Sequence, residues 1–262
     1  MQLISDLLRL TDKKKQKNEG MKKVILSVLT LGVLTSCSCS GLNVTFSHTD
    51  AQAQEQRPLT GFERIELLGS LDVKYQQADS FSVRVDAPVE VLKKVETRVD
   101  GNKLVVKMKG DGKWINFGVA DSKNVTVYVT SPDFLGIMLK GSGDFESQGL
   151  LDTDNLEISL QGSGDISFDD VICDQVDVSL VGSGDVDVKN VKALRSNISL
   201  VGSGDVKMNF DNSGMVEATV TGSGDITLNG KVKKYKSNVR GSGDINAGGL
   251  MILEESTETT IK

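Results

Sequence analysis

The tetrapeptide Gly-Ser-Gly-Asp occurs six times in this 262-residue chain at nearly constant spacing. The copies begin at Gly141, Gly162, Gly182, Gly202, Gly222 and Gly241, so the successive separations are 21, 20, 20, 20 and 19 residues. A repeat of this length is typical of a solenoid, in which each unit buries its apolar face only by stacking on its neighbours. The spacing therefore predicts a stack of coils.

Apolar and polar residues alternate on both sides of each copy, as they do in a β-strand. The apolar positions next to the motif are Leu139, Leu160, Leu180, Leu200, Val220 and Val239 before it, and Phe145, Ile166, Val186, Val206, Ile226 and Ile245 after it. A second, variable bend, such as Asp169-Asp170, lies midway between successive copies. The pattern predicts an all-β parallel β-helix, or β-solenoid, of about 20-residue coils with two sheets face to face.

Each tetrapeptide is interpreted as a corner turn between two strands. Glycine adopts positive φ without steric cost, and we expect this conformation at both glycines of a copy. The aspartate is expected to accept hydrogen bonds from nearby amides. The residues assigned to these turns are Gly141, Gly143, Asp144, Gly162, Gly164, Asp165, Gly182, Gly184, Asp185, Gly202, Gly204, Asp205, Gly222, Gly224, Asp225, Gly241, Gly243 and Asp244.

The segment Gly69-Ser70-Leu71-Asp72 has the same flanking pattern and is interpreted as a seventh copy with leucine in place of the second glycine. Alternating runs at 81–85, 104–108 and 125–129 predict further, less regular strands. We therefore assign residues 60–140 to degenerate solenoid strands, 141–250 to the regular repeats and 251–262 to a polar tail. Terminal repeats are expected to differ because they must cap an open edge.

The first 37 residues are interpreted as an upstream extension and a lipoprotein signal peptide. Met21-Lys22-Lys23 begins a basic region, an 11-residue apolar stretch follows, and Leu34-Thr35-Ser36-Cys37 resembles a lipobox. This ending predicts lipidation of Cys37, whereas Cys39 fits the lipobox less well. Residues 38–59 are expected to form a flexible tether to the membrane.

The six corners, the opening run at 61–67, the partial copy at Gly69 and the lipobox at Cys37 together resemble the autotransporter-adhesin head domain, also called the GIN domain, of exported bacterial lipoproteins. The resemblance covers about residues 60–250. It implies a right-handed superhelix related in shape to pectin lyases and a role in cell adhesion. It implies no catalytic residues.

Two features of charge leave alternatives open. The stacked aspartates could bind calcium, but the Asp adjoins the last glycine, unlike in calcium-binding β-helix repeats, so solvated carboxylates that accept amides are favoured and no metal is assigned. Basic residues gather in the later bends and could attract a polyanion, although such residues also protect a sheet edge. They are Lys189, Lys192, Arg195, Lys231, Lys233, Lys234, Lys236 and Arg240.

The expected function is that of a non-enzymatic structural or binding module, anchored by lipid at the bacterial outer membrane and serving in cell adhesion. The alternative is a glycan-binding or glycan-cleaving β-helix, since glycosidases need only two suitably spaced carboxylates. No cofactor is expected. The net charge of −6 and the low aromatic content argue against nucleic acid. A glycan or protein ligand and a homo-oligomer stay open.

Overall fold

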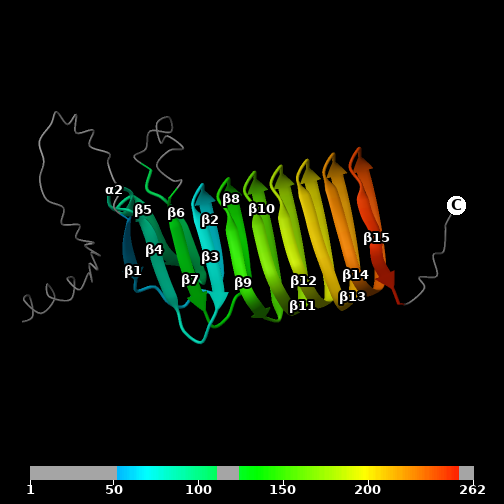
Figure 1. Ribbon diagram of the computed structural model, residues 1–262, viewed down its shortest axis with the longest axis horizontal. Coiled ribbons are helices and arrows are strands. Elements are labelled where there is room, and N and C mark those ends of the chain that lie inside the picture. The colour runs from blue at the N-terminus through cyan, green and yellow to red at the C-terminus, as the bar shows by residue number, and fades with distance from the viewer. Residues whose placement is uncertain (1–51, 111–123, 254–262) are drawn as a thin grey trace, which may run out of the picture. The chain divides into compact units, whose positions relative to one another are not determined.

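The computed structural model describes residues 52–110 and 124–253, and the strands of these residues stack side by side as a solenoid (Figure 1). The strands on either side of the Gly141 corner are β8 (Gly136–Gly141) and β9 (Phe145–Asp152). From β11 to β14 a single long strand runs from one corner to the next. The following strands are β10 (Asn155–Gly162), β11 (Ile166–Gly182), β12 (Val186–Gly202), β13 (Asp205–Gly222), β14 (Asp225–Gly241) and β15 (Ile245–Ile252).

Each corner lies directly beside the corner of the preceding coil. The pairing between successive coils is parallel and places Gly162 next to Gly141 and Gly182 next to Gly162. The same register continues to Gly241, which lies next to Gly222. The predicted all-β solenoid with coils of about 20 residues is therefore confirmed.

The variable region between corners contains two bends. In β11 the buried side chains alternate except at two places, where Val171 follows Phe168 and Val176 follows Cys173. In a straight strand, residues three positions apart point to opposite faces. Here both residues of each pair point into the core, so the chain must turn between them. A short third side, which carries Val171 and Cys173, therefore joins the two longer sides of the coil.

The core consists of apolar columns that run along the solenoid axis. The column two residues before the corners is fully buried from Leu139 to Val220, and so is the column that follows the aspartates from Phe145 to Ile226. Identical positions in successive coils stack because the parallel register is constant. Burial of these columns is the main stabilising contribution expected for such a stack.

The amino-terminal end begins with a coil around Gly69. Strands β2 (Arg64–Gly69) and β3 (Asp72–Gln77) lie on either side of this corner, and Gly69 pairs with Gly141. The prediction of a partial seventh copy is thus confirmed. Strands β6 (Lys103–Met108) and β7 (Thr126–Ser131) continue the two sheets in parallel on the far side of β2 and β3.

Antiparallel strands complete this end of the solenoid. Strand β5 (Val95–Asp100) pairs with β6, β4 (Ser82–Pro88) pairs with β7, and β1 (Gln52–Arg57) pairs with β4. One helical turn, α2 (Val89–Leu92), follows β4. The helices of the described residues include none long and apolar enough to cross a membrane.

Strand β1 corrects a predicted boundary. The sequence places residues 52–57 in the tether because the run Gln-Ala-Gln-Glu-Gln-Arg contains no large apolar side chain. These residues nevertheless form an edge strand because their backbone pairs with β4 over six residues, from Gln52 to Arg57. A strand at the edge of a sheet has a neighbouring strand on one side only and can consist of polar residues. The composition of residues 52–57 therefore does not predict that they form a strand.

The carboxy-terminal end lacks a comparable cover of described residues. Val239 occupies the same core column as Val220 but is 42% exposed, whereas Val220 is completely buried. Ser237, which continues the column of Ala218, is also exposed. The two ends of the described solenoid therefore differ, with one closed by antiparallel strands and the other open.

Candidate functional site

The first glycine of each corner adopts the positive φ that was predicted. Its φ lies between +129° and +142° at all six copies, and it is +103° at Gly69. The carbonyl oxygen of this glycine accepts a hydrogen bond from the serine amide of the next coil, for example from Ser163 to Gly141 at 2.9 Å. The corner is therefore both a tight turn and a contact between coils.

The third residue of the corner requires glycine for a different reason, which corrects our prediction. Gly143, Gly164, Gly184 and Gly204 do not have positive φ. A Cβ atom at Gly184 would instead lie closer than 3.0 Å to the carbonyl oxygen of Gly164 in the preceding coil. Close approach of two backbones, rather than an unusual dihedral angle, excludes a side chain here.

Leu71 shows why the first coil can depart from the motif. It occupies the position of the second glycine and is fully buried in the core. A Cβ atom at Gly143 would meet the backbone of Leu71, so each such Cβ position points toward the preceding coil. The coil of Leu71 has no Gly-Ser-Gly-Asp corner before it, so no glycine backbone of a preceding corner excludes a side chain at this position.

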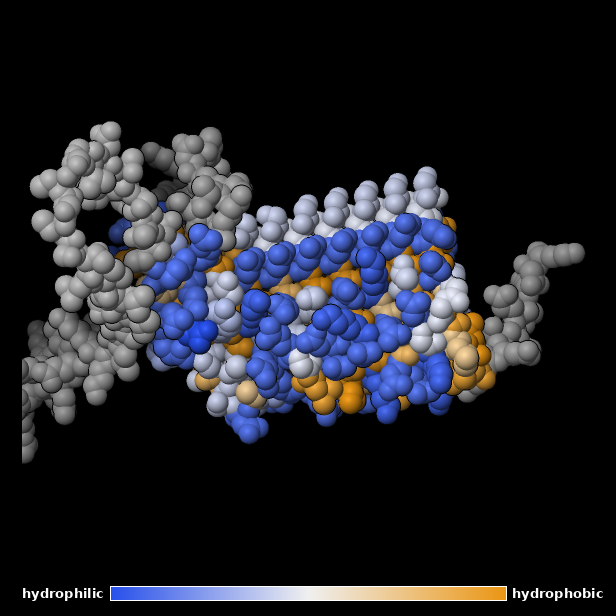
Figure 2. Space-filling model, in the orientation of Figure 1, coloured by the Kyte–Doolittle hydropathy of each residue, from blue (hydrophilic) through white to orange (hydrophobic). Residues whose placement is uncertain are grey.

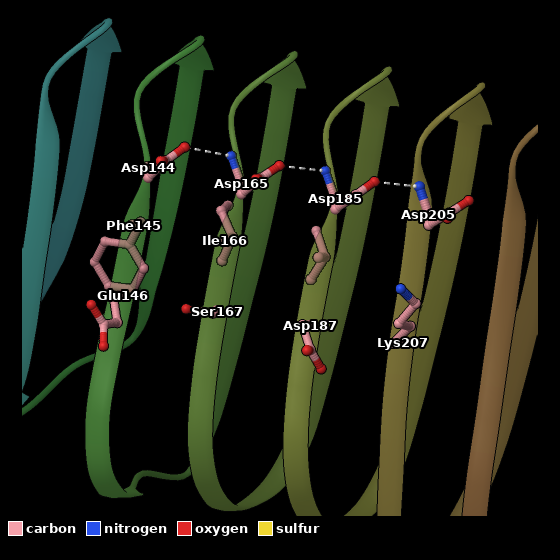
Figure 3. Close-up of a pocket in the computed structure, with 11 residues that line it drawn as sticks. Asp144, Phe145, Glu146, Asp165, Ile166, Ser167, Asp185, Asp187, Asp205 and Lys207 are labelled. Carbon is pink, nitrogen blue, oxygen red and sulfur yellow. Dashed lines mark hydrogen bonds between the residues drawn. The ribbon is translucent and has the colours of Figure 1, made fainter. Parts of the chain in front are cut away.

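The aspartates of the corners form a ladder of hydrogen bonds along the solenoid, drawn from Asp144 to Asp205 in Figure 3. The amide of each aspartate donates to the Oδ1 of the aspartate in the preceding coil, as Asp165 does to Asp144 at 3.1 Å. The series runs from Asp72 to Asp244, with distances of 2.9–3.3 Å. At the last step Asp244 accepts from the amide of Ile245 instead, at 2.8 Å. The prediction that these carboxylates accept amides is confirmed.

The ladder is electrostatically strained at two of its members. Burial raises the pKa of the Asp165 carboxyl; the hydrogen bond from the Asp185 amide opposes this shift, while the charges of Asp144 and Asp185 add to it. Burial likewise raises the pKa of Asp72, against the hydrogen bond from Asp144. The hydrogen bonds thus offset only part of the cost of desolvating these carboxylates and of placing like charges beside them.

The carboxylates border a shallow hollow on the side of the coil that follows the corner. It has a volume of about 410 Å³, and its lining includes Asp144, Asp165, Glu146, Asp187 and Lys207 (Figure 3). In Figure 2 a hydrophilic row runs along the solenoid next to the ridge of corners. Within residues 52–110 and 124–253, no group of three or more His, Cys, Asp or Glu side chains is placed to hold a metal ion.

The opposite long side carries a second row of polar groups. A hollow of about 550 Å³ is lined by the hydroxyls of Ser159, Ser179, Ser199 and Thr219, one from each successive coil. Carboxylates and an amide accompany them, and Asn197 Nδ2 donates to Asp177 Oδ1 at 2.7 Å. In the sequence, these small polar residues indicate only the alternation of a β-strand. A single repeat does not show that the hydroxyls of successive coils lie in one row.

The raised pKa of Asp165 predicts how its substitution affects stability. Because the folded state disfavours the ionised carboxylate, Asp165 contributes most to stability when it is protonated, below the ordinary pKa of 3.8. This contribution is lost as the pH rises through the folded-state pKa, so the charged carboxylate weakens folding at neutral pH. Asp165→Asn keeps the acceptor and removes the charge, so we expect the melting temperature at pH 7 to rise by roughly 1–3 °C. The difference from wild type should disappear near pH 3, where the carboxyl is protonated.

Asp165→Ala is the matched control because it removes charge and acceptor together. The amide of Asp185 then loses its partner, at a cost of about 1 kcal/mol, so the melting temperature at pH 7 should fall. Thermal melts that rank the alanine variant above the asparagine variant would contradict the role of this hydrogen bond.

Calcium is expected to leave the melting temperature unchanged. Each Oδ1 of the ladder is already directed at an amide, which leaves few oxygens to converge on an ion that prefers six to eight. The measurement is a thermal melt in millimolar calcium and in chelator. A site occupied at a hundred times its dissociation constant would add about 2.7 kcal/mol, so a stabilisation of that size would overturn this prediction.

The structure also locates the remaining predicted features. Cys173 is buried and free, and burial raises the pKa of its thiol to about 12, so it is an inert core side chain. Cys37, Cys39 and most of the predicted tether lie outside the described residues. Lipidation of Cys37 therefore stays a prediction.

Known proteins resemble the chain in family and fold. The family model described as "Putative auto-transporter adhesin, head GIN domain" matches residues 61–189 and 179–258. No curated protein matches the chain.

Two solved structures share this architecture. A protein from Bacteroides fragilis, described as a "putative adhesin", is 23% identical with a TM-score of 0.61, and the match covers 74% of this chain and 96% of that one. A protein from Parabacteroides distasonis, described as a "Putative lipid binding protein", is 19% identical with a TM-score of 0.58 and the same two coverages. At these identities the likeness shows the fold alone.

Proposed function

Because the chain belongs to the autotransporter-adhesin head GIN-domain family, we propose that it is a non-enzymatic, lipid-anchored module of the bacterial cell envelope that binds a ligand in adhesion. The observation that carries this proposal is that exposed polar side chains repeat in rows along coils of constant register. The Asp ladder and the corner glycines serve contacts between coils, whereas the hydroxyl row from Ser159 to Thr219 faces outward in a shallow hollow.

A row of equally spaced hydroxyls and carboxylates suits a ligand that is itself extended and polar, such as a glycan or a polypeptide. Neighbouring strands in a sheet lie about 4.8 Å apart, so the same group is offered at each coil. Rigid presentation reduces the entropy lost on binding. The proposed binding surface is therefore the side of the coils that precedes the corner.

The anchor can be tested through Cys37. Cys37→Ala should abolish acylation and release the protein from the membrane fraction, because a lipid chain is the proposed attachment. The measurement is fractionation with detection of a lipid-dependent mobility shift, and Cys39→Ala is the control that should stay anchored. Continued membrane attachment of Cys37→Ala, with loss only in the Cys39 variant, would move the lipid to Cys39.

Adhesion itself requires display on the cell surface and a specific face. Protease added to intact cells should digest the protein, and Ser179→Arg with Ser199→Arg should reduce cell attachment by blocking the hydroxyl row. Ser183→Arg with Ser203→Arg, on the ridge of corners, is the matched control. Protection from protease, or equal loss of attachment in both pairs, would refute adhesion while leaving the anchor untouched.

A further inference from the structure

The open carboxy-terminal end of the described solenoid combines exposed apolar residues with a high density of positive charge. Met251, Ile252 and Leu253 are 56%, 47% and 52% exposed at the end of β15. Val239 on the edge strand is 42% exposed in a column that is otherwise buried. Figure 2 shows hydrophobic residues gathered at the end of the solenoid where β15 lies in Figure 1.

The positive charge lies on the same last coil. Its cations are Lys231, Lys233, Lys234, Lys236 and Arg240, and all five are exposed. Residues 225–252, which hold β14 and β15, contain two carboxylates, Asp225 and Asp244, against these five cations, although the whole chain carries a net charge of −6. The end is therefore a locally basic region on an acidic protein.

The strand register brings the two kinds of residue together. Lys231 pairs with Met251, and Val232 pairs with Ile252. Lys233 follows directly, and the amide of Leu253 donates to the carbonyl of Val232 at 2.8 Å. Lys231 and Lys233 thus lie beside the exposed apolar residues, and the two segments together are called the basic-apolar end (residues 231–240 and 251–253).

Cations in the interior coils pair with carboxylates of a neighbouring strand. Lys189 Nζ lies 2.7 Å from Asp169 Oδ1, and Lys74 Nζ lies 2.9 Å from Glu146 Oε2, each on the neighbouring strand. Lys236 on the last coil is paired in the same way, since its Nζ lies 3.3 Å from Glu217 Oε1 of the preceding coil. The outer side of the last described coil faces no further described strand, so Lys231, Lys233 and Arg240 are the cations that an external anionic partner would contact.

We propose that the basic-apolar end is a docking surface for an anionic lipid bilayer. Apolar side chains such as Met251 and Leu253 would enter the boundary of the acyl chains, while the surrounding cations contact the negatively charged headgroups. A second copy of the chain is a poorer partner, because two such ends would bring like charges together across unpaired strand edges. This contact is separate from the proposed lipid on Cys37.

The test measures binding to vesicles by sedimentation, with the full chain carrying Cys37→Ala so that no acyl chain contributes. Vesicles of phosphatidylcholine alone are compared with vesicles containing phosphatidylglycerol, at low and high salt. The triple variant Lys231→Gln, Lys233→Gln, Arg240→Gln is compared with the control Lys192→Gln, Arg195→Gln, Lys207→Gln. Both triples remove three exposed cations, and neither set includes a member of the ion pairs described above.

We expect the first triple to weaken the preference for anionic vesicles by about tenfold or more, and the control triple to change it little. Met251→Ser with Leu253→Ser should weaken the part of binding that survives high salt. Equal loss in both triples, or the absence of any preference for anionic vesicles, would overturn the proposal. A concentration-dependent dimer in sedimentation velocity that disappears in Val239→Lys would also overturn it, since the end would then bind a second copy.

Discussion

Gly184→Ala should lower the free energy of unfolding by about 3 kcal/mol or more, although it adds a single methyl group. The new Cβ atom would lie closer than 3.0 Å to the backbone carbonyl of Gly164, and no side-chain rotation can relieve contact with a carbonyl of the preceding coil. The coils would have to separate at the corner, which weakens the hydrogen bonds on both sides of it. Urea denaturation followed by circular dichroism measures the loss.

Two variants serve as controls for this prediction. A methyl group added at Gly110 would meet no atom within 4 Å, and this glycine has no positive φ, so Gly110→Ala should change stability by less than about 1 kcal/mol. Ser183→Ala, inside the same corner, should also have a small effect because its side chain is exposed. If Gly184→Ala unfolds at the same urea concentration as these variants, the close approach of the corners is not a constraint on stability.

Phe145→Ala is expected to cost about 3–5 kcal/mol, since it removes the ring at the centre of an aromatic cluster. The ring centroid of Phe145 lies 5.5 Å from that of Phe168, 5.9 Å from Phe134 and 6.3 Å from Tyr75. This cluster joins the amino-terminal strands to the regular coils. Because a solenoid is stabilised by contacts between neighbours, the loss should be concentrated at that junction.

Hydrogen exchange can locate the effect of Phe145→Ala. Amides of β3, β8 and β9 should lose protection, while those of β13 and β14 keep more of theirs. Phe145→Leu is the control, because the same column holds Ile166 and Val186 in the next coils, and it should cost only about 1–2 kcal/mol. A uniform loss of protection along the whole solenoid would show that the stack unfolds as one unit.

The regular part of this fold could be predicted from sequence because one motif specifies three things at once. The spacing of Gly141 to Gly241 sets the length of a coil, the alternation around it sets the inward face, and the equal register aligns both from coil to coil. The strand directions at the amino-terminal end could not be predicted in the same way. Alternation at 81–85 or 104–108 is identical for parallel and antiparallel strands, so only their partners distinguish β4 from β6.

The sequence of a single repeat does not determine why the second glycine of the corner is required or which amide bonds to the aspartate. Glycine at Gly184 is compatible both with positive φ and with close approach of a neighbour, and only the stacked coils show that the second reason applies. The sequence predicts that Asp165 accepts a hydrogen bond from a nearby amide, and only the structure shows that this amide belongs to Asp185 of the next coil. Both differences arise because the sequence motif is local while its interactions are between coils.

The hydrogen bonds of the Asp ladder all run in one direction, from the amide of one coil to the carboxylate of the coil before it. Insertion or removal of one complete repeat between two corners would therefore leave every donor and acceptor with an equivalent partner. A gene that encodes such a protein can change the length of its product by in-frame duplication or deletion of one unit, without any compensating substitution. Repeat number is then a trait on which selection can act independently of the sequence within each repeat.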